Sequence, residues 1–168
     1  AGIPAASAPI SLGSSYETPV SMDLTDEEKF GLFTVVDANN DGKTWTWSIN
    51  GTNCVYNRTE ASDDWLITPL INLKAGNQYT LVAEMRSGNS RYAETYEIKA
   101  GHSATVDDMT ITVVEPTSIS VNTRAPYSVI FTPESDGAYC FGIHCTSPKN
   151  QYNLYVYSIS VSEGVSTG

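Results

Sequence analysis

The sequence has few basic residues. Nine Lys and Arg stand against nineteen Asp and Glu, so the 168-residue chain carries a formal net charge of −10. Such a chain repels nucleic-acid backbones and anionic lipid surfaces, so we expect neither as a partner. No apolar run approaches the roughly 20 residues needed to cross a bilayer, so membrane insertion is not expected either. The acidic excess instead leaves carboxylates available for divalent cations.

Cysteine and histidine are also scarce. Three cysteines cannot form a full disulfide framework, and Cys140 and Cys145 would face opposite sides of a continuous strand. We therefore expect free, buried thiols. Neither His102 nor His144 lies near a nucleophile elbow, and zinc spacings and phosphate-binding glycine loops are missing. We interpret His144 as a partly buried strand residue and predict that the protein is not an enzyme.

The first residues, AGIPAASAPISLGSS, lack the basic and apolar regions of a signal peptide. They resemble a linker rich in Pro, Ala and Ser, so we interpret the sequence as a mature protein or as part of a larger chain. The expected organisation is a linker or disordered segment over 1–15, one domain over 16–163 and a C-terminal tail over 164–168. A domain of this size can bury a substantial core.

Short apolar or alternating runs, separated by turn residues, recur along the chain. They predict nine strands, at Leu32–Val36, Thr44–Ile49, Trp65–Ile67, Tyr79–Met85, Tyr92–Ile98, Ile111–Val114, Tyr127–Phe131, Ala138–Ile143 and Leu154–Val161. Only 17% of the residues are charged, which is typical of an extracellular β-protein. The sequence therefore predicts an all-β fold, a two-sheet antiparallel β-sandwich.

The stretch VVDANNDGKTWTW contains a candidate metal loop. Asp37, Asn39 and Asp41 occupy alternate positions before a glycine, as in the first half of a calcium loop, and the carbonyl of Lys43 follows. Position twelve is Ser48 instead of the required Glu, which excludes an EF-hand. Two interpretations stay open: a shortened calcium loop completed by ligands from elsewhere, or a hairpin turn that needs no metal.

The other acidic residues are weaker candidates for a metal or catalytic site. Asp63 and Asp64 precede a strand and point to opposite sides in extended backbone, so at most one can join a shared site. We interpret them as solvated charges in a turn at the start of that strand. Paired acids for glycoside hydrolysis could be assembled from Glu84, Glu94 and Glu97, but nothing in the sequence selects them.

Aromatic residues offer a second kind of site. Proteins commonly bind sugars with aromatic rings and nearby polar groups. Trp45 and Trp47 share one face of a predicted strand, and Tyr92 and Tyr155 lie in two others. We take these four as candidate ligand-binding residues. The alternative is that the rings fill the sandwich core or cover its rim.

Five segments, taken in order, resemble the adhesin-type jelly-roll domains of anaerobic Gram-negative bacteria, which include the cleaved adhesin domains of gingipains and the choice-of-anchor modules of gut commensals. The segments are FGLFTVVDANNDGKTWTW, DDWLITPLINLKAGNQYTLVAEMRS, RYAETYEIKAG, YSVIFTPESDGAYCFGIHCTS and LYVYSISVSE. The resemblance extends from about Tyr16 to Glu163. It implies a galactose-binding-like jelly roll in a bacterial protein that is secreted or displayed at the cell surface in association with the outer membrane.

The resemblance also implies a function. Family members are mostly non-catalytic modules of larger chains that bind glycans or host or bacterial surface proteins, and some carry structural calcium. By position, Asp37, Asn39 and Asp41 fall on the family's acidic loop, which favours calcium here. The family's last strand often carries an acid where this chain has Tyr157 and Ser158, which argues against a calcium site that spans the loop and that strand. The alternative functions are a structural spacer in a surface protein and, less favoured, a glycoside-processing enzyme.

Overall fold

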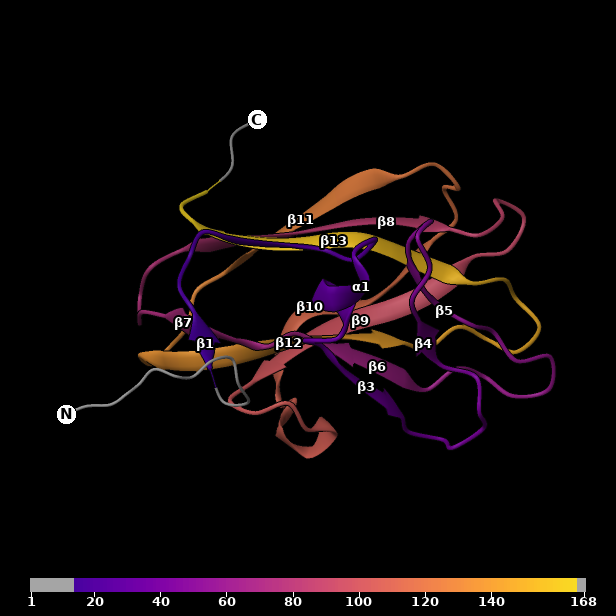
Figure 1. Ribbon diagram of the computed structural model, residues 1–168, viewed down its shortest axis with the longest axis horizontal. Helices are drawn as coiled ribbons and strands as arrows, with labels where there is room; N and C mark the ends of the chain where they lie inside the picture. Colours follow the sequence, from indigo (N-terminus) through magenta and orange to yellow (C-terminus); the bar gives the residue numbers. More distant parts are fainter. Residues whose placement is uncertain (1–13, 166–168) are drawn as a thin grey trace.

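The computed structural model describes residues 14–165 and folds them into two stacked β-sheets, which Figure 1 shows as two layers. The predicted β-sandwich is confirmed. Most of the expected linker over 1–15 and the last three residues of the expected tail over 164–168 lie outside the described residues. None of the described helices is long and apolar enough to span a membrane.

The first sheet has seven strands in the order β1-β7-β12-β6-β3, with β9 pairing β12 and β10 pairing β9. Only β1 and β7 pair in parallel among the described strands of this sheet. The strands are β1 (Ser15–Tyr16), β3 (Thr34–Asp37), β6 (Asp64–Ile67), β7 (Leu70–Leu73), β9 (Glu94–Gly101), β10 (Ile111–Ile119) and β12 (Gly137–Cys145).

The second sheet has six strands in the order β11-β8-β13-β5-β4, with β2 pairing the other part of β13. Its strands are β2 (Val20–Asp23), β4 (Trp45–Thr46), β5 (Thr52–Cys54), β8 (Tyr79–Ser87), β11 (Ala125–Phe131) and β13 (Leu154–Glu163). Two short helical segments, α1 (Glu27–Phe30) and η2 (Val106–Asp108), lie in connections between strands.

All nine predicted strands overlap observed ones, but four short strands were not predicted. These are β1, β2, β5 and β7, each two to four residues long. So short a strand offers too few positions for alternation to be recognised. The predicted strand Thr44–Ile49 is also too long, because β4 ends at Thr46.

The core lies between the two sheets. Leu66 and Ile71 from the first sheet and Met85 and Leu154 from the second are fully buried. Alternation along β8 and β9 places every second side chain inward, as the predicted patterning requires. The three cysteines are free and buried, which confirms the prediction made from their number and spacing.

Candidate metal centre and ligand-binding surfaces

Three carboxylates meet at one end of the first sheet. β3 and β6 pair with Asp37 directly opposite Asp64. The loop after β3 then turns back through two residues with positive φ, Asn40 at 54° and Gly42 at 81°, and this turn brings Asp41 to the same place. One oxygen from each of the three aspartates lies within 4.8 Å of the other two. Like charges directly opposite one another destabilise a strand pair, so this arrangement is a candidate cation site.

The loop itself is held by hydrogen bonds to its own acids. Asp37 accepts hydrogen bonds from the backbone N–H groups of Asp41 at 3.3 Å and Gly42 at 2.8 Å. Asp41 accepts from Lys43 N–H and from Asn57 Nδ2, each at 2.9 Å. Burial is the largest single influence and opposes ionisation of Asp41, but the hydrogen bonds from Lys43 and Asn57, together with those to Asp37 and Asn39, outweigh it and lower the pKa of Asp41. The Asp41 carboxylate is therefore held as an anion by its hydrogen-bond donors.

Asp64 is the member of the cluster that the sequence did not predict. Its side chain is fully buried, which corrects the interpretation of Asp64 as a solvated charge. Its Oδ2 accepts from Asp63 N–H at 3.2 Å, whereas its Oδ1 is buried and has no hydrogen-bond partner among the described residues. Burial, together with the charges of Asp37 and Asp41, raises the pKa of Asp64 to about 7.

The geometry and the chemistry of the cluster fit Ca²⁺. Calcium takes carboxylate and amide oxygens as ligands, and the three aspartates bring one oxygen each to within 4.8 Å of the others. Asn39 adds a side-chain oxygen, Oδ1, that is buried without a hydrogen-bond partner among the described residues. Among the described residues, no basic side chain forms an ion pair with any of the three aspartates.

Trp45 supports this cluster and does not form an exposed binding face. It is buried, and its Nε1 donates a hydrogen bond to the backbone carbonyl of Asp64 at 3.1 Å. Trp45 and Trp47 do not share one face of a strand as predicted, because β4 ends at Thr46, and Trp47 is itself partly buried. The open alternative, that such rings fill the core, is the correct one for Trp45.

Tyr92 belongs to a group of three stacked tyrosines, which we call the tyrosine ladder: Tyr56, Tyr92 and Tyr152. The ring of Tyr152 stacks on Tyr92 with 4.9 Å between centroids and on Tyr56 with 5.8 Å. Tyr92 and Tyr152 are both exposed. The fourth candidate, Tyr155, is partly buried and stacks on Arg86, on a different part of the surface.

The three glutamates considered for hydrolysis do not converge. Glu84 forms an ion pair with Arg124 on the second sheet. Glu94 is buried on the first sheet, where burial raises its pKa and Ser147 Oγ donates to it. Glu97 contacts Nδ1 of His144 at 2.7 Å. Each acid thus has its own partner, and no pair of them brackets a common cleft.

His144 lies between two acids and against a tryptophan. Its two ring nitrogens lie 2.7 Å from Glu97 and 2.7 Å from Asp63, and its ring stacks on Trp65 with 4.0 Å between centroids. The prediction that His144 is a partly buried strand residue is confirmed. Asp63 is therefore the half-exposed partner of a histidine, while its neighbour Asp64 joins the acidic cluster.

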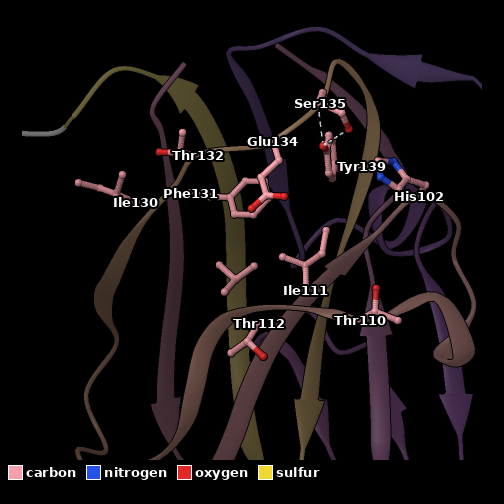
Figure 2. Close-up of a pocket in the computed structure, with 11 residues that line it drawn as sticks. His102, Thr110, Ile111, Thr112, Ile130, Phe131, Thr132, Glu134, Ser135 and Tyr139 are labelled. Atoms are coloured by element: carbon pink, nitrogen blue, oxygen red, sulfur yellow. Dashed lines mark hydrogen bonds between the residues drawn. The ribbon is translucent and has the colours of Figure 1, made fainter. Parts of the chain in front are cut away.

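A further pocket, of about 570 Å³, lies where β10 and β11 meet the start of β12 (Figure 2). Ile111 and Phe131 line it, and Tyr139, Ser135 and His102 lie together at one side. The hydroxyl of Tyr139 donates to the carbonyl of Ser135 at 2.8 Å, and His102 Nδ1 lies 3.0 Å from a backbone carbonyl.

Comparison with known proteins identifies solved structures with a similar fold. No protein family matches the sequence, and no curated protein matches it. The K1 cleaved adhesin domain of Lys-gingipain from Porphyromonas gingivalis is a similar solved structure, with a TM-score of 0.67 and 15% identity; the match covers 88% of this chain and 99% of that domain. The K3 domain of the same protein has a TM-score of 0.65 and 14% identity, covering 85% and 96%.

A third similar structure is the BiXyn10A CBM1 domain, with a TM-score of 0.56 and 12% identity over 88% of this chain and 99% of that one. At these identities the likeness shows a shared fold. The resemblance to gingipain adhesin domains that the sequence segments indicated is confirmed at that level.

Proposed function

We propose that this protein is a non-catalytic carbohydrate-binding and adhesion module, secreted or displayed at the cell surface, whose loops are stabilised by calcium. The observation that carries the proposal is the fold, shared over nearly the whole chain with two cleaved adhesin domains and with the BiXyn10A CBM1 domain. The separate pairing of Glu84, Glu94 and Glu97 supports a role without catalysis.

In this proposal, Asp37, Asp41 and Asp64 bind the calcium ion, and the side-chain oxygen of Asn39 and the carbonyl of Lys43 are the additional ligands. A bound divalent ion offsets the repulsion among the carboxylates. It also ties the loop between β3 and β4 to the start of β6. The ion would thereby fix the conformation of this loop. The sequence of the loop alone is compatible with either a metal site or a simple turn.

The same ion would order the tyrosine ladder. Asp41 accepts a hydrogen bond from Asn57, and Tyr56, the residue before Asn57, stacks on Tyr152. Exposed aromatic rings next to amide side chains are suited to contact the C–H faces and hydroxyl groups of sugars. We therefore assign the ladder as a glycan-contacting surface, and expect its binding to weaken when calcium is removed.

Retention on immobilised polysaccharides tests the binding claim. The panel contains neutral and acidic polysaccharides, each with calcium and with EGTA. We expect retention on at least one of them, and expect Tyr152→Ala to weaken it, with Lys74→Gln as a control at an exposed position outside the ladder. If no polysaccharide retains the protein in the presence of calcium, the carbohydrate-binding proposal is wrong. That outcome would favour the alternative of a structural spacer.

Thermal unfolding tests the metal claim. A ligand at about 100 times its Kd stabilises the native state by about 2.7 kcal/mol, which for a domain of this length raises Tm by about 5–10 °C. We expect EGTA to remove this increment and added calcium to restore it, and Asp37→Ala to abolish the response. Unfolding curves that EGTA leaves unchanged would contradict the calcium site.

A further inference from the structure

The outer face of the second sheet holds an open pocket of about 560 Å³ that is rich in arginine and tyrosine. Arg86, Arg124, Tyr155 and Tyr157 line it, together with the loop that carries Ile49. No Asp or Glu is among the described residues that line this pocket, although the chain has nineteen acidic residues and only nine basic ones. Two of the few positive charges of an acidic protein thus meet in one place.

The strands place three of these side chains. Arg86 of β8 lies directly opposite Tyr155 of β13 in the antiparallel register. The register shifts between Val156 and Ser158, so Tyr157 is the extra residue of a β-bulge, a device that often re-aims a side chain beside a site. The rings of Tyr155 and Tyr157 consequently stack on each other, with 6.3 Å between centroids.

Arg86 is held rigidly but is not neutralised. Its guanidinium lies 3.9 Å over the ring of Tyr155, Nε donates to the hydroxyl of Tyr157 at 2.6 Å, and Nη1 donates to the carbonyl of Ser87 at 3.0 Å. These contacts leave Nη2 without a hydrogen bond in the described part of the chain. Over the same residues, Arg86 forms no ion pair. The pocket therefore presents a fixed, uncompensated positive charge.

Arg124 contributes less charge. Its guanidinium lies 4.6 Å over the ring of Tyr157 and donates to Glu84, with Nε at 3.0 Å from the carboxylate. Glu84 accepts from Ser158 as well, and Asp23 is a second acid whose charge acts on Arg124. These two acids neutralise Arg124 from outside the pocket, so the selectivity for an anion falls on Arg86.

We propose that this pocket binds an anionic group of an acidic polysaccharide, with Arg86 as its principal ligand. A planar guanidinium held by stacking matches a carboxylate or a sulfate through parallel N–H···O hydrogen bonds. Ile49 is 72% exposed at the rim and offers apolar area to a sugar ring. The inference rests on the proposed carbohydrate-binding function and adds the class of glycan and the residue that selects it.

Binding to polygalacturonate, measured by affinity electrophoresis, tests the inference. We expect Arg86→Gln to weaken binding by about tenfold or more, since hydrogen bonds to charged groups are the strong ones. The exposed Arg58 provides a matched control, and Arg58→Gln should change binding by less than about twofold. Added NaCl should weaken binding of the wild type more than binding of Arg86→Gln.

A second pair of variants does not disturb packing. Ile49→Glu and Ile49→Gln are nearly equal in size and differ in one charge at an exposed position. We expect Ile49→Glu to reduce polygalacturonate binding by about tenfold relative to Ile49→Gln, because it places a carboxylate at the rim of the arginine pocket. Equal binding by the two Ile49 variants, or wild-type binding by folded Arg86→Gln, would overturn the assignment.

Further ligands separate the sources of the anion. Binding to dextran sulfate but not to polygalacturonate would identify sulfate esters as the preferred anionic group. Loss of dextran sulfate binding in Arg86→Gln would then also support the assignment. Tighter binding to polyglutamate than to both acidic polysaccharides would show a peptide site and overturn it. Retention on neutral polysaccharides alone would refute this inference while leaving the proposed function intact, whereas retention on none refutes both.

Discussion

The acidic cluster makes a sharp prediction about a buried charge. In the metal-free protein, Asp64→Asn should increase stability at neutral and higher pH, although the residue is completely buried. The reason is that Asn fills nearly the same volume and cannot ionise. Its amide oxygen can still accept the hydrogen bond from Asp63 N–H, and its amide group can donate to the neighbouring carboxylates.

The magnitude follows from the pKa. An aspartate ionises near a pKa of about 3.9 in an unfolded chain, whereas burial raises the pKa of Asp64 in the folded protein to about 7. At about 1.4 kcal/mol per pH unit, ionising Asp64 above that range costs the folded state about 4 kcal/mol. The folded protein binds the proton more tightly than the unfolded chain, so stability falls as pH rises from about 4 to about 7.

The assay is urea unfolding in EGTA, followed by tryptophan fluorescence. The variant should exceed the wild type by about 4 kcal/mol near pH 8 and by only about 1.5 kcal/mol near pH 5. Any packing cost of the amide is independent of pH, so the change of about 2.5 kcal/mol between the two conditions is the diagnostic quantity. Asp107→Asn, an exposed aspartate on η2, is the matched control and should show no such change.

Calcium should reverse the order of stability of the wild type and Asp64→Asn. Only wild type keeps the full set of carboxylates, so saturating calcium should stabilise wild type above the variant near pH 8. The reasoning is refuted if Asp64→Asn destabilises the metal-free protein equally at both pH values, because Asp64 would then not be a buried ionised group. It is also refuted if the variant keeps the full calcium response.

Three further predictions concern the scaffold. Gly51→Ala should lower the free energy of unfolding by about 1–3 kcal/mol in urea titrations, because Gly51 has φ +117° and a Cβ there would lie 2.7 Å from the ring of Tyr157. Ellman's reagent should label no cysteine in the native protein and all three in denaturant; burial also raises the pKa of the Cys140 thiol to about 11. His144→Ala should lower the free energy of unfolding in urea by about 1–2 kcal/mol, because Glu97 loses a partner that lies 2.7 Å away.

Much of the fold follows from local pattern, and much of the site does not. Long strands such as β8 and β13 show alternation that the sequence displays directly, over Leu81–Ser87 in β8 and over Leu154–Val161 in β13, where only the bulge residue Tyr157 interrupts it. The loop acids Asp37 and Asp41 were found for the same reason, since their spacing is local. Asp64 was missed because its role depends on the register that places it opposite Asp37. The only signal was a pair of acids before a strand, and that signal fits a solvated turn equally well.

The burial and the contacts of the aromatic residues could not be predicted from the local sequence either. Whether a strand residue faces the core or solvent depends on where the strand ends and which sheet it joins. Trp45 was assigned to a binding face, but its indole N–H is used inside the protein to hold the carbonyl of Asp64. The tyrosine ladder joins Tyr56, Tyr92 and Tyr152 from three separate connections, and no spacing along the chain indicates that they meet.

The proposed anion site depends on the tyrosine at the bulge of β13. The three carboxylates of the acidic cluster come from elsewhere, namely Asp37, Asp41 and Asp64. At the bulge of β13, Tyr157 accepts the hydrogen bond from Nε of Arg86 and stacks beneath Arg124. An aspartate in its place would put a negative charge beside Arg86 and neutralise it. A tyrosine at this position thus supports the side chain of Arg86 without neutralising it, and leaves the outer face of the second sheet free to bind an anion.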